Sequence, residues 1–327
     1  MIGDGPVAAC GFLVAPNGTV QLKRPTTAVF YADGIEHYIT SFEYGGGNVD
    51  FGSIIPLPDV PTSVERGGEW TLQRLVKEIT PSPAPCATCS SQFAASDEAE
   101  VLLQTKIDAL EITVLRGGAA EVVEWAESNG FQLPDDASDQ LGFYAERSPI
   151  FMAARFDTTT ARELGQFGGD GTPIHVTVPT GVPWVPLRIL GMAKAPDSRV
   201  EADVFLLTES APNMLPLPHD RMALRRSEPA SAELLDDLRS DEGMGFVPEK
   251  MWLTYLAIDA PASSVTYELA IEADGVGLPS LVDTGLTRSD LPTSEDAPWA
   301  TALVIIGSFG IVMVAATPGR RHLANVR

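Results

Sequence analysis

Three cysteines are the residues whose type and spacing could do chemistry in this sequence. Cys86 and Cys89 form a Cys-x-x-Cys pair after the proline-rich stretch 81–85, and Cys10 lies near the start. A thioredoxin-type redox pair needs a strand before it and a helix beginning at it, and a proline-rich loop precedes this pair instead. A structural zinc site needs four ligands, for which the three cysteines would need a histidine such as His37. We favour a structural disulfide, with Cys10 paired to Cys86 or to Cys89.

The four histidines form no recognisable catalytic motif. They are His37, His175, His219 and His322. The sequence contains no His-Glu-x-x-His pattern, no Gly-x-Ser-x-Gly elbow and no phosphate-binding loop. His37 and His175 lie in predicted strands, where a packed or surface histidine is more common than a general base. A hydrolase assembles its nucleophile, base and orienting group only in the folded chain, so we assign no catalytic, cofactor-binding or metal-binding residue.

Acidic residues outnumber basic ones by 44 to 22, which gives a net charge of -22. This charge argues against nucleic acid or anionic lipid as a partner of the folded body. Acidic clusters such as Asp97-Glu98-Ala-Glu100 and Asp135-Asp136 lack the alternating carboxylates around a glycine that an EF-hand loop requires. We therefore expect no cofactor, and we interpret the charge mainly as an aid to solubility.

An uncharged run, residues 299–317, precedes the C-terminal residues 318–327. A helix of about 19 residues would rise about 28 Å, close to the thickness of a bilayer core. The run predicts one transmembrane helix, because a buried core helix would carry more polar residues along one face. The anchoring residues would be Trp299, Leu303, Ile306, Phe309 and Val312.

The charges on either side of this run predict its orientation. Basic residues follow it and acidic residues precede it. The positive-inside rule then places residues 318–327 in the cytoplasm and the body outside, in a single-pass cell-membrane protein. The residues that set this topology are Arg320, Arg321 and Arg327.

Both ends of the chain leave alternatives open. The stretch Leu291-Pro-Thr-Ser-Glu295 resembles a degenerate cell-wall sorting signal, in which Ser294 and Glu295 replace the threonine and glycine. Residues 1–9 are too short for a complete signal peptide, although Val7-Ala8-Ala9 resembles the end of one. We therefore expect a signal-peptide remnant or leader before Cys10. A tail-anchored protein with a cytoplasmic body is the alternative, which the charge rule disfavours.

Residues 10–273 predict an α+β body with a mostly antiparallel sheet and a few packed helices. The composition, 44% hydrophobic and 20% charged, is that of a folded globular domain. Apolar patterning predicts strands over 28–34 and 36–44 that turn at Asp33-Gly34. It predicts helices over 71–79, 119–129 and 138–147.

The C-terminal third of the body shows weaker patterns. Residues 211–249 lose periodicity and are rich in proline, serine and charge, which predicts a long surface excursion with one short helix. Residues 251–258 and 265–271 predict a hairpin. Residues 274–298 are rich in glycine, proline and polar residues, which is typical of a stalk.

Several stretches of the body resemble one protein family. They are Ala9-Cys10-Gly11, the proline-rich segment from Asp50 to Pro61, the segment from Glu121 to Pro134, and Pro186-Leu-Arg-Ile-Leu190. Over residues 9–273 the chain resembles the DUF2330 family of exported bacterial proteins. The family pattern has a second cysteine soon after the first, and Phe12, Leu13 and Val14 occupy that space here. The resemblance implies export, often with a C-terminal anchor, and it implies no activity.

Together these patterns predict a membrane-anchored extracytoplasmic protein, and we favour a function without enzymatic activity. It would serve as an interaction or accessory module at the cell surface, with the membrane and surface proteins as partners. The alternative is an anchored hydrolase of envelope material. A pocket with His37 or His175 beside a carboxylate and a hydroxyl would favour that alternative.

Overall fold

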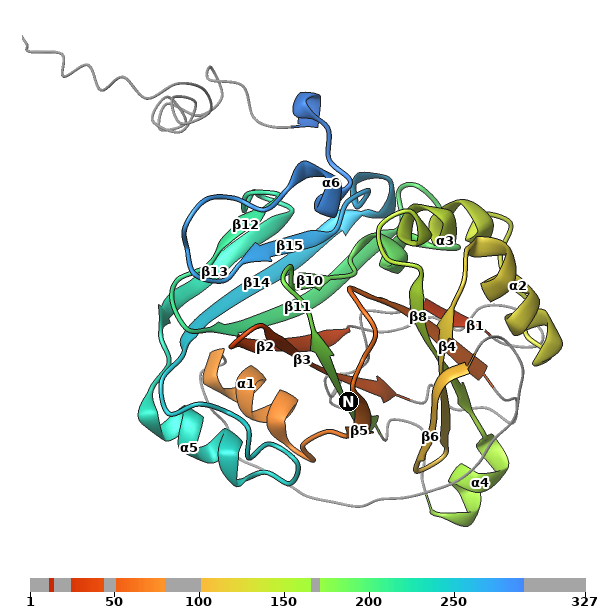
Figure 1. Ribbon diagram of the computed structural model, residues 1–327, viewed down its shortest axis with the longest axis horizontal. Coiled ribbons are helices and arrows are strands. Elements are labelled where there is room, and N and C mark those ends of the chain that lie inside the picture. Colours follow the sequence, from red (N-terminus) through yellow and green to blue (C-terminus); the bar gives the residue numbers. More distant parts are fainter. Residues whose placement is uncertain (1–11, 15–24, 44–50, 80–100, 166–170, 291–327) are drawn as a thin grey trace, which may run out of the picture. The chain divides into compact units, whose positions relative to one another are not determined.

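Two β-sheets packed against each other form the centre of the described chain (Figure 1). The computed structural model describes residues 12–14, 25–43, 51–79, 101–165 and 171–290. The chain divides into two compact units, residues 1–286 and residues 287–327. Of the second unit, the structure describes residues 287–290, which include the short helix η3 (Arg288–Asp290).

The larger sheet has seven strands, of which only the β11–β2 pair is parallel. Its order is β13-β14-β11-β2-β3-β9-β5. The strands are β13 (Met222–Pro229), β14 (Trp252–Pro261), β11 (Arg199–Thr208), β2 (Thr26–Ala32), β3 (Ile35–Glu43), β9 (Gly171–Pro179) and β5 (Ser63–Arg66).

Two antiparallel sheets complete the β-structure. The five-stranded sheet has the order β1-β4-β8-β7-β6, and the three-stranded sheet has the order β10-β15-β12. The strands of the first are β1 (Phe12–Val14), β4 (Phe51–Leu57), β8 (Ile150–Phe156), β7 (Leu110–Arg116) and β6 (Val101–Ile107). Those of the second are β10 (Trp184–Val185), β15 (Leu269–Glu272) and β12 (Asn213–Leu215).

Helices cover the outer faces of the two large sheets. α1 (Thr71–Ile79) and α5 (Ala232–Ser240) pack on the seven-stranded sheet, and α2 (Ala119–Ser128) and α3 (Ala137–Ala145) pack on the five-stranded sheet (Figure 1). The remaining helices are short: α4 (Thr158–Glu163), α6 (Leu281–Thr284), η1 (Arg188–Gly191) and η2 (Ala262–Ser264).

Strands buried on both faces explain this layering. In β11, Val204 and Leu206 point into the core between the sheets, while Phe205 and Leu207 point toward α1 and α5. Successive side chains of a strand face opposite ways, so an uninterrupted apolar run fills two separate cores. All four of these side chains are fully buried.

The strongest sequence patterns are confirmed. β2 and β3 form the predicted hairpin, with Asp33 and Gly34 at φ 52° and 77°, a conformation that suits a two-residue turn. The helix predicted over 71–79 is α1, and those predicted over 119–129 and 138–147 are α2 and α3. Gly130 follows α2 with a positive φ of 80°, as a glycine at a helix C-terminus commonly does.

Residues 211–249, expected to form a surface excursion with one short helix, contain β12, β13 and α5. The predicted short helix is α5. The edge strand β13 exposes most of its side chains, so its sequence lacks the alternation of apolar and polar residues that would predict a strand. α5 instead buries Leu234, Leu235 and Leu238 against the seven-stranded sheet.

A buried carboxylate joins this segment to α1. Asp241, directly after α5, accepts hydrogen bonds from the backbone N–H of Glu69 and Trp70 and from the hydroxyl of Thr71, at 3.0, 2.9 and 2.8 Å. A carboxylate at this position satisfies the free N–H groups at the N-terminus of α1. Gly68 is required beside it, because a Cβ there would lie 2.3 Å from an Asp241 oxygen.

The segments expected to form a second hairpin and a stalk also differ from the expectation. β14 lies in the seven-stranded sheet and β15 in the three-stranded sheet, so the two do not pair. The first part of the expected stalk, residues 274–286, belongs to the first unit. There Thr284 accepts a backbone hydrogen bond from Glu268 at 2.9 Å.

The expected fold class is wrong in its transmembrane helix. Within the ranges given above, no helix is long and apolar enough to cross a membrane. The longest of them, α2, has 10 residues and rises about 15 Å, half of a bilayer core of about 30 Å. The predicted span, residues 299–317, lies outside the described residues. The described fold is a mostly β body with a few helices.

The position of α5 in the core predicts a large effect for one truncation. Leu238→Ala should lower the free energy of unfolding by about 2 to 5 kcal/mol, because it removes a fully buried side chain. Leu224→Ala in β13 is the matched control, and at 45% exposure it should change stability by less than about 1 kcal/mol. Urea denaturation measures both. Equal small losses would contradict the packing of α5.

Candidate functional site

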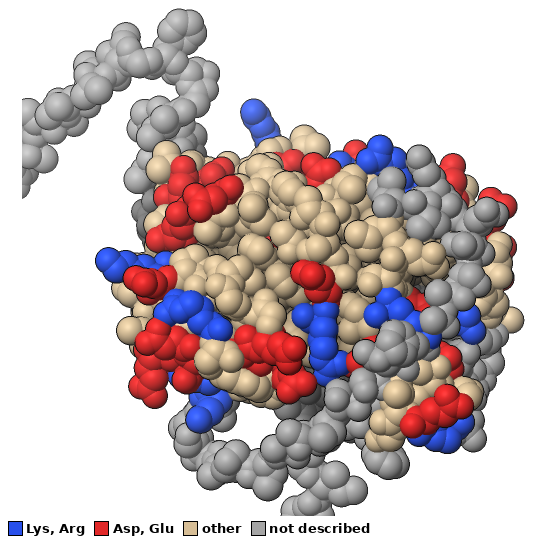
Figure 2. Space-filling view, turned by 60° about the horizontal axis from the view of Figure 1, so that its bottom comes forward, with Lys and Arg blue, Asp and Glu red and all other residues tan. Residues whose placement is uncertain are grey.

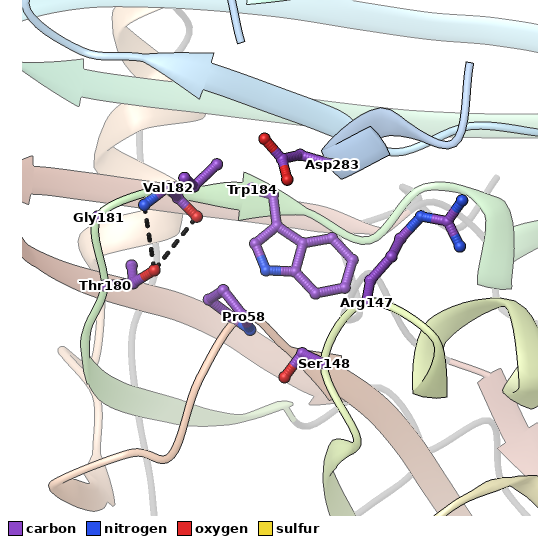
Figure 3. A pocket seen from close by; sticks show the side chains of 8 residues that line it. All are labelled: Pro58, Arg147, Ser148, Thr180, Gly181, Val182, Trp184 and Asp283. Atoms are coloured by element: carbon purple, nitrogen blue, oxygen red, sulfur yellow. Dashed lines mark hydrogen bonds between the residues drawn. The ribbon is translucent and has the colours of Figure 1, made fainter. Parts of the chain in front are cut away.

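A small open pocket lies where four separate chain segments meet. Its volume is about 210 Å³, below the roughly 300 to 1,000 Å³ of sites for drug-sized ligands. The segments are the end of β4, the end of α3, the β9–β10 connection and α6 (Figure 3). The lining residues are Pro58, Arg147, Ser148, Thr180, Gly181, Val182, Trp184 and Asp283, and we call this site the Trp184 pocket.

Trp184 forms the centre of the pocket (Figure 3). It lies in β10, pairs with Ala270 of β15, and is only 5% exposed. Its ring packs against Tyr144 with centroids 5.7 Å apart. The position of the ring is therefore set by the core behind it, and only a small part of the side chain borders the pocket.

Arg147 lines one side of the pocket with its side chain. Its Nε donates to the Val282 carbonyl at 3.0 Å, and its Nη1 donates to the Phe143 carbonyl. The guanidinium also lies 3.6 Å from the centroid of the Phe143 ring. Burial is the main cause that lowers the pKa of Arg147. These contacts join the end of α3 to α6 and occupy the charged end of the side chain.

Gly285 is required for this junction. It ends α6 in the left-handed conformation, at φ 70°. A Cβ at this position would lie 2.4 Å from atoms of the Phe143 ring, which Arg147 stacks upon. A substitution there would be strained in the backbone and would displace the aromatic ring.

A buried carboxyl supports the pocket from behind. Glu268 has no exposed surface and accepts hydrogen bonds from the Tyr144 hydroxyl at 2.7 Å and the Leu187 N–H at 2.8 Å. A longer bond of 3.2 Å comes from the Arg188 N–H. The Tyr144 hydroxyl in turn accepts the Ile189 N–H at 2.8 Å. Burial raises the pKa of Glu268 to about 8, although these hydrogen bonds lower it in part.

A second buried carboxyl lies beneath the other side of the pocket. Glu36 is paired in register with Tyr31, whose hydroxyl donates to the carbonyl of the pocket residue Thr180 at 2.9 Å. Burial raises the pKa of Glu36 to about 8, and the Trp184 backbone lowers it only in part. Within the described chain neither carboxyl oxygen has a hydrogen-bond partner of good geometry. A protonated, neutral Glu36 fits these surroundings better than an ionised one.

His37 and His175 lie side by side on β3 and β9, on the face of the seven-stranded sheet opposite to Glu36. Nδ1 of His37 is 2.8 Å from Nε2 of His175, and the Thr177 hydroxyl is 3.3 Å from the same Nε2. Phe246 stacks on both rings, with centroids 3.8 and 4.7 Å away. Burial lowers the pKa of His37 to about 4 and that of His175 to about 3.

This histidine pair does not have the arrangement that would favour a hydrolase. Neither residue lines the Trp184 pocket, and Phe246 covers both rings. A general base works best with a pKa near the working pH, and these values are far lower. Among the described residues, no group of three or more His, Cys, Asp or Glu side chains could hold a metal ion.

The site residues named from the sequence fall outside the described residues. Cys10, Cys86 and Cys89 do so, and the disulfide remains a prediction. The anchoring and topology-setting residues Trp299, Leu303, Ile306, Phe309, Val312, Arg320, Arg321 and Arg327 do so as well.

The residues of the Trp184 pocket were missed by the sequence analysis. Its members come from positions 58 to 283 and converge only in the fold. One signal was available: Glu268 stands alone in the apolar stretch from Val265 to Ile271. A single acidic residue in a strand pattern is more often exposed than buried, so this signal was weak.

The buried Glu36 predicts a specific dependence of stability on pH. With a folded pKa of about 8 against a usual 4.5, its stabilising contribution is full below pH 4.5 and is lost as the pH rises toward 8. The loss is about 1.4 kcal/mol per pH unit within that interval. Between pH 5.5 and 7.5, wild type should lose about 2 to 3 kcal/mol more than Glu36→Gln in urea unfolding. Parallel pH profiles would show that Glu36 does not titrate this way.

Comparison with known proteins identifies a family but no activity. Residues 5–221 match the family described as an uncharacterized protein conserved in bacteria (DUF2330). No curated protein matches the chain.

Two solved structures show a distant likeness. One is a mutated baculovirus P35 after caspase cleavage, 9% identical, with a TM-score of 0.38 over 77% of this chain and 95% of that chain. The other is baculovirus P35, 8% identical, with a TM-score of 0.36 over 80% and 92%. Likenesses this weak carry no argument about function. The family match covers most of the described body, and the chain therefore belongs to the DUF2330 family of uncharacterized proteins conserved in bacteria.

Proposed function

We propose that this protein is a binding module that recognises a protein partner through the Trp184 pocket. The observation that carries the proposal is a concave, solvent-open site with a rigidly held tryptophan at its centre. Tryptophan is enriched among the residues that contribute most to protein–protein binding, and such residues cluster in well-packed pockets.

The size of the pocket supports a protein partner over a free metabolite. At about 210 Å³ it is smaller than the roughly 300 to 1,000 Å³ of most small-molecule sites. A partner would therefore anchor one residue in the pocket and make its remaining contacts around the rim.

Apolar side chains flank the pocket. Val182 lines it and is 38% exposed, and Val282, beside Asp283, is 71% exposed. On the face of the molecule that Figure 2 shows, acidic and basic side chains are interspersed around a broad area of uncharged residues.

The proposal includes the cell-surface location expected from the sequence. It is supported by the resemblance of the chain to a family of exported proteins. A surface module would meet its partner outside the cytoplasm.

A substitution at the rim tests the binding function. Val182→Arg places a long charged side chain at the pocket, whereas Val276→Arg, the matched control, alters a valine that is 75% exposed and does not line it. Random peptides displayed on phage would be selected on the immobilised full chain. We expect the affinity of selected peptides to be about 30-fold lower for Val182→Arg than for wild type, which is the size of the effect at an interaction hot spot. Their affinity for Val276→Arg should equal that for wild type.

The outcome decides the proposal in both directions. Peptides whose affinity falls only with Val182→Arg would support the Trp184 pocket as the binding site. If no selected peptide distinguishes the two variants, the pocket is not where the protein binds.

Protease treatment of intact cells tests the location. A protease added outside should digest the body, which an antibody against residues 171–286 would detect by immunoblot. A cytoplasmic protein of the same cells serves as the control for lysis and should stay intact. A body that resists the protease until the cells are lysed would contradict the surface location.

A further inference from the structure

The carboxylate of Asp283 is the one acidic group among the residues that line the Trp184 pocket. It belongs to α6 and is half-buried. No side chain or backbone group of the described residues bonds to it. Figure 3 shows the carboxylate directed over the Trp184 side of the pocket. A half-buried carboxylate without a partner favours the approach of a cation.

The neighbouring cation is already engaged. Arg147 donates to two backbone carbonyls and stacks on Phe143, as described above. In Figure 3 its guanidinium points away from the Trp184 ring, so that its aliphatic stem is what borders the pocket. Arg147 therefore forms no ion pair with Asp283, and the carboxylate oxygens of Asp283 remain available to accept hydrogen bonds from a cation.

The Trp184 ring adds a second attraction for a cation. Figure 3 shows the face of the indole at the centre of the pocket, between the Asp283 carboxylate and the Ser148 hydroxyl. The face of a tryptophan ring attracts ammonium and guanidinium groups more strongly than other aromatic rings do. The Ser148 hydroxyl has no described partner and can accept a further N–H donor.

The charge of the whole chain acts in the same direction. With a net charge of -22, the protein attracts basic partners over a long range and repels acidic ones.

We propose that the Trp184 pocket binds the side chain of a lysine or arginine residue of the partner protein. The ammonium or guanidinium pairs with Asp283 and lies over the Trp184 ring, while the aliphatic part of the side chain contacts Pro58 and Val182. The inference rests on the proposed binding function and names the chemistry of its partner. An acidic side chain would instead meet Asp283 with the same charge.

Three defined peptides test this inference. They are acetylated, amidated pentapeptides of the form Gly-Gly-X-Gly-Gly, in which X is lysine, norleucine or glutamate. Norleucine is the control for lysine, since it has a similar apolar length without the charge. Isothermal titration calorimetry with the full chain at low ionic strength should show the lysine peptide binding about tenfold more tightly than the norleucine peptide. The glutamate peptide should bind more weakly than either.

A charge-neutral variant locates the effect. Asp283→Asn should abolish the preference for lysine, because it removes the charge and nearly keeps the shape. Asp197→Asn is the matched control, an exposed acidic residue before β11 that is not part of the pocket. It should leave the preference for lysine unchanged. Raising the salt concentration should reduce that preference in wild type.

The outcomes separate this inference from the proposed function. Equal binding of the three peptides, tighter binding of the glutamate peptide, no binding at all, or a lysine preference that survives Asp283→Asn would each overturn the inference. If Val182→Arg still weakens the binding of selected peptides, the proposed binding function stands, with another kind of side chain in the pocket. If Val182→Arg weakens no selected peptide, the binding function and the inference of a basic anchor both fail.

Discussion

The requirement that a buried carboxyl be hydrogen-bonded shapes the region around the pocket more than any other constraint. Glu268 lies with no exposed surface among the end of α3, η1 and β15. A carboxyl in such a place destabilises the fold by several kcal/mol unless donors surround it. Tyr144, Leu187 and Arg188 supply three donors, and Tyr144 passes the network on to Ile189. These bonds fix α3 and η1 relative to β15, and β15 in turn holds Trp184 through its pairing with β10.

The pocket lies at the margin of the layered core, where regular pairing ends. The large sheets use alternate residues of the same strands to fill two cores, as Val204 and Phe205 do. The connections after β4, α3 and β9 leave this regular pattern and meet α6. Loops held by a rigid scaffold are the usual place for binding residues. The rigidity of Trp184 matters for this function, because a side chain that is already fixed loses little conformational entropy when a partner binds.

Sequence reasoning predicted those elements whose patterns are local. The β2–β3 hairpin has its Asp33-Gly34 turn, and α1, α2 and α3 have apolar residues at helical spacing. It missed the role of residues 211–249, because β13 exposes most of its length and the core contribution of α5 depends on a partner surface far away in the sequence. It missed the pocket for the same reason: Pro58, Ser148, Trp184 and Asp283 share no local pattern. The predicted disulfide and the cysteines that would form it lie beyond the described residues.

His37 and His175 form a packed pair under Phe246, whereas the pocket that we propose as functional has no histidine. The proposed function requires a basic side chain to enter that pocket. A crystal structure of the full chain with the lysine pentapeptide tests this most directly. We expect the lysine stem over the indole of Trp184 and its ammonium within about 4 Å of the Asp283 carboxylate, the distance of an ion pair. A peptide bound elsewhere, or a lysine turned out into solvent, would contradict it.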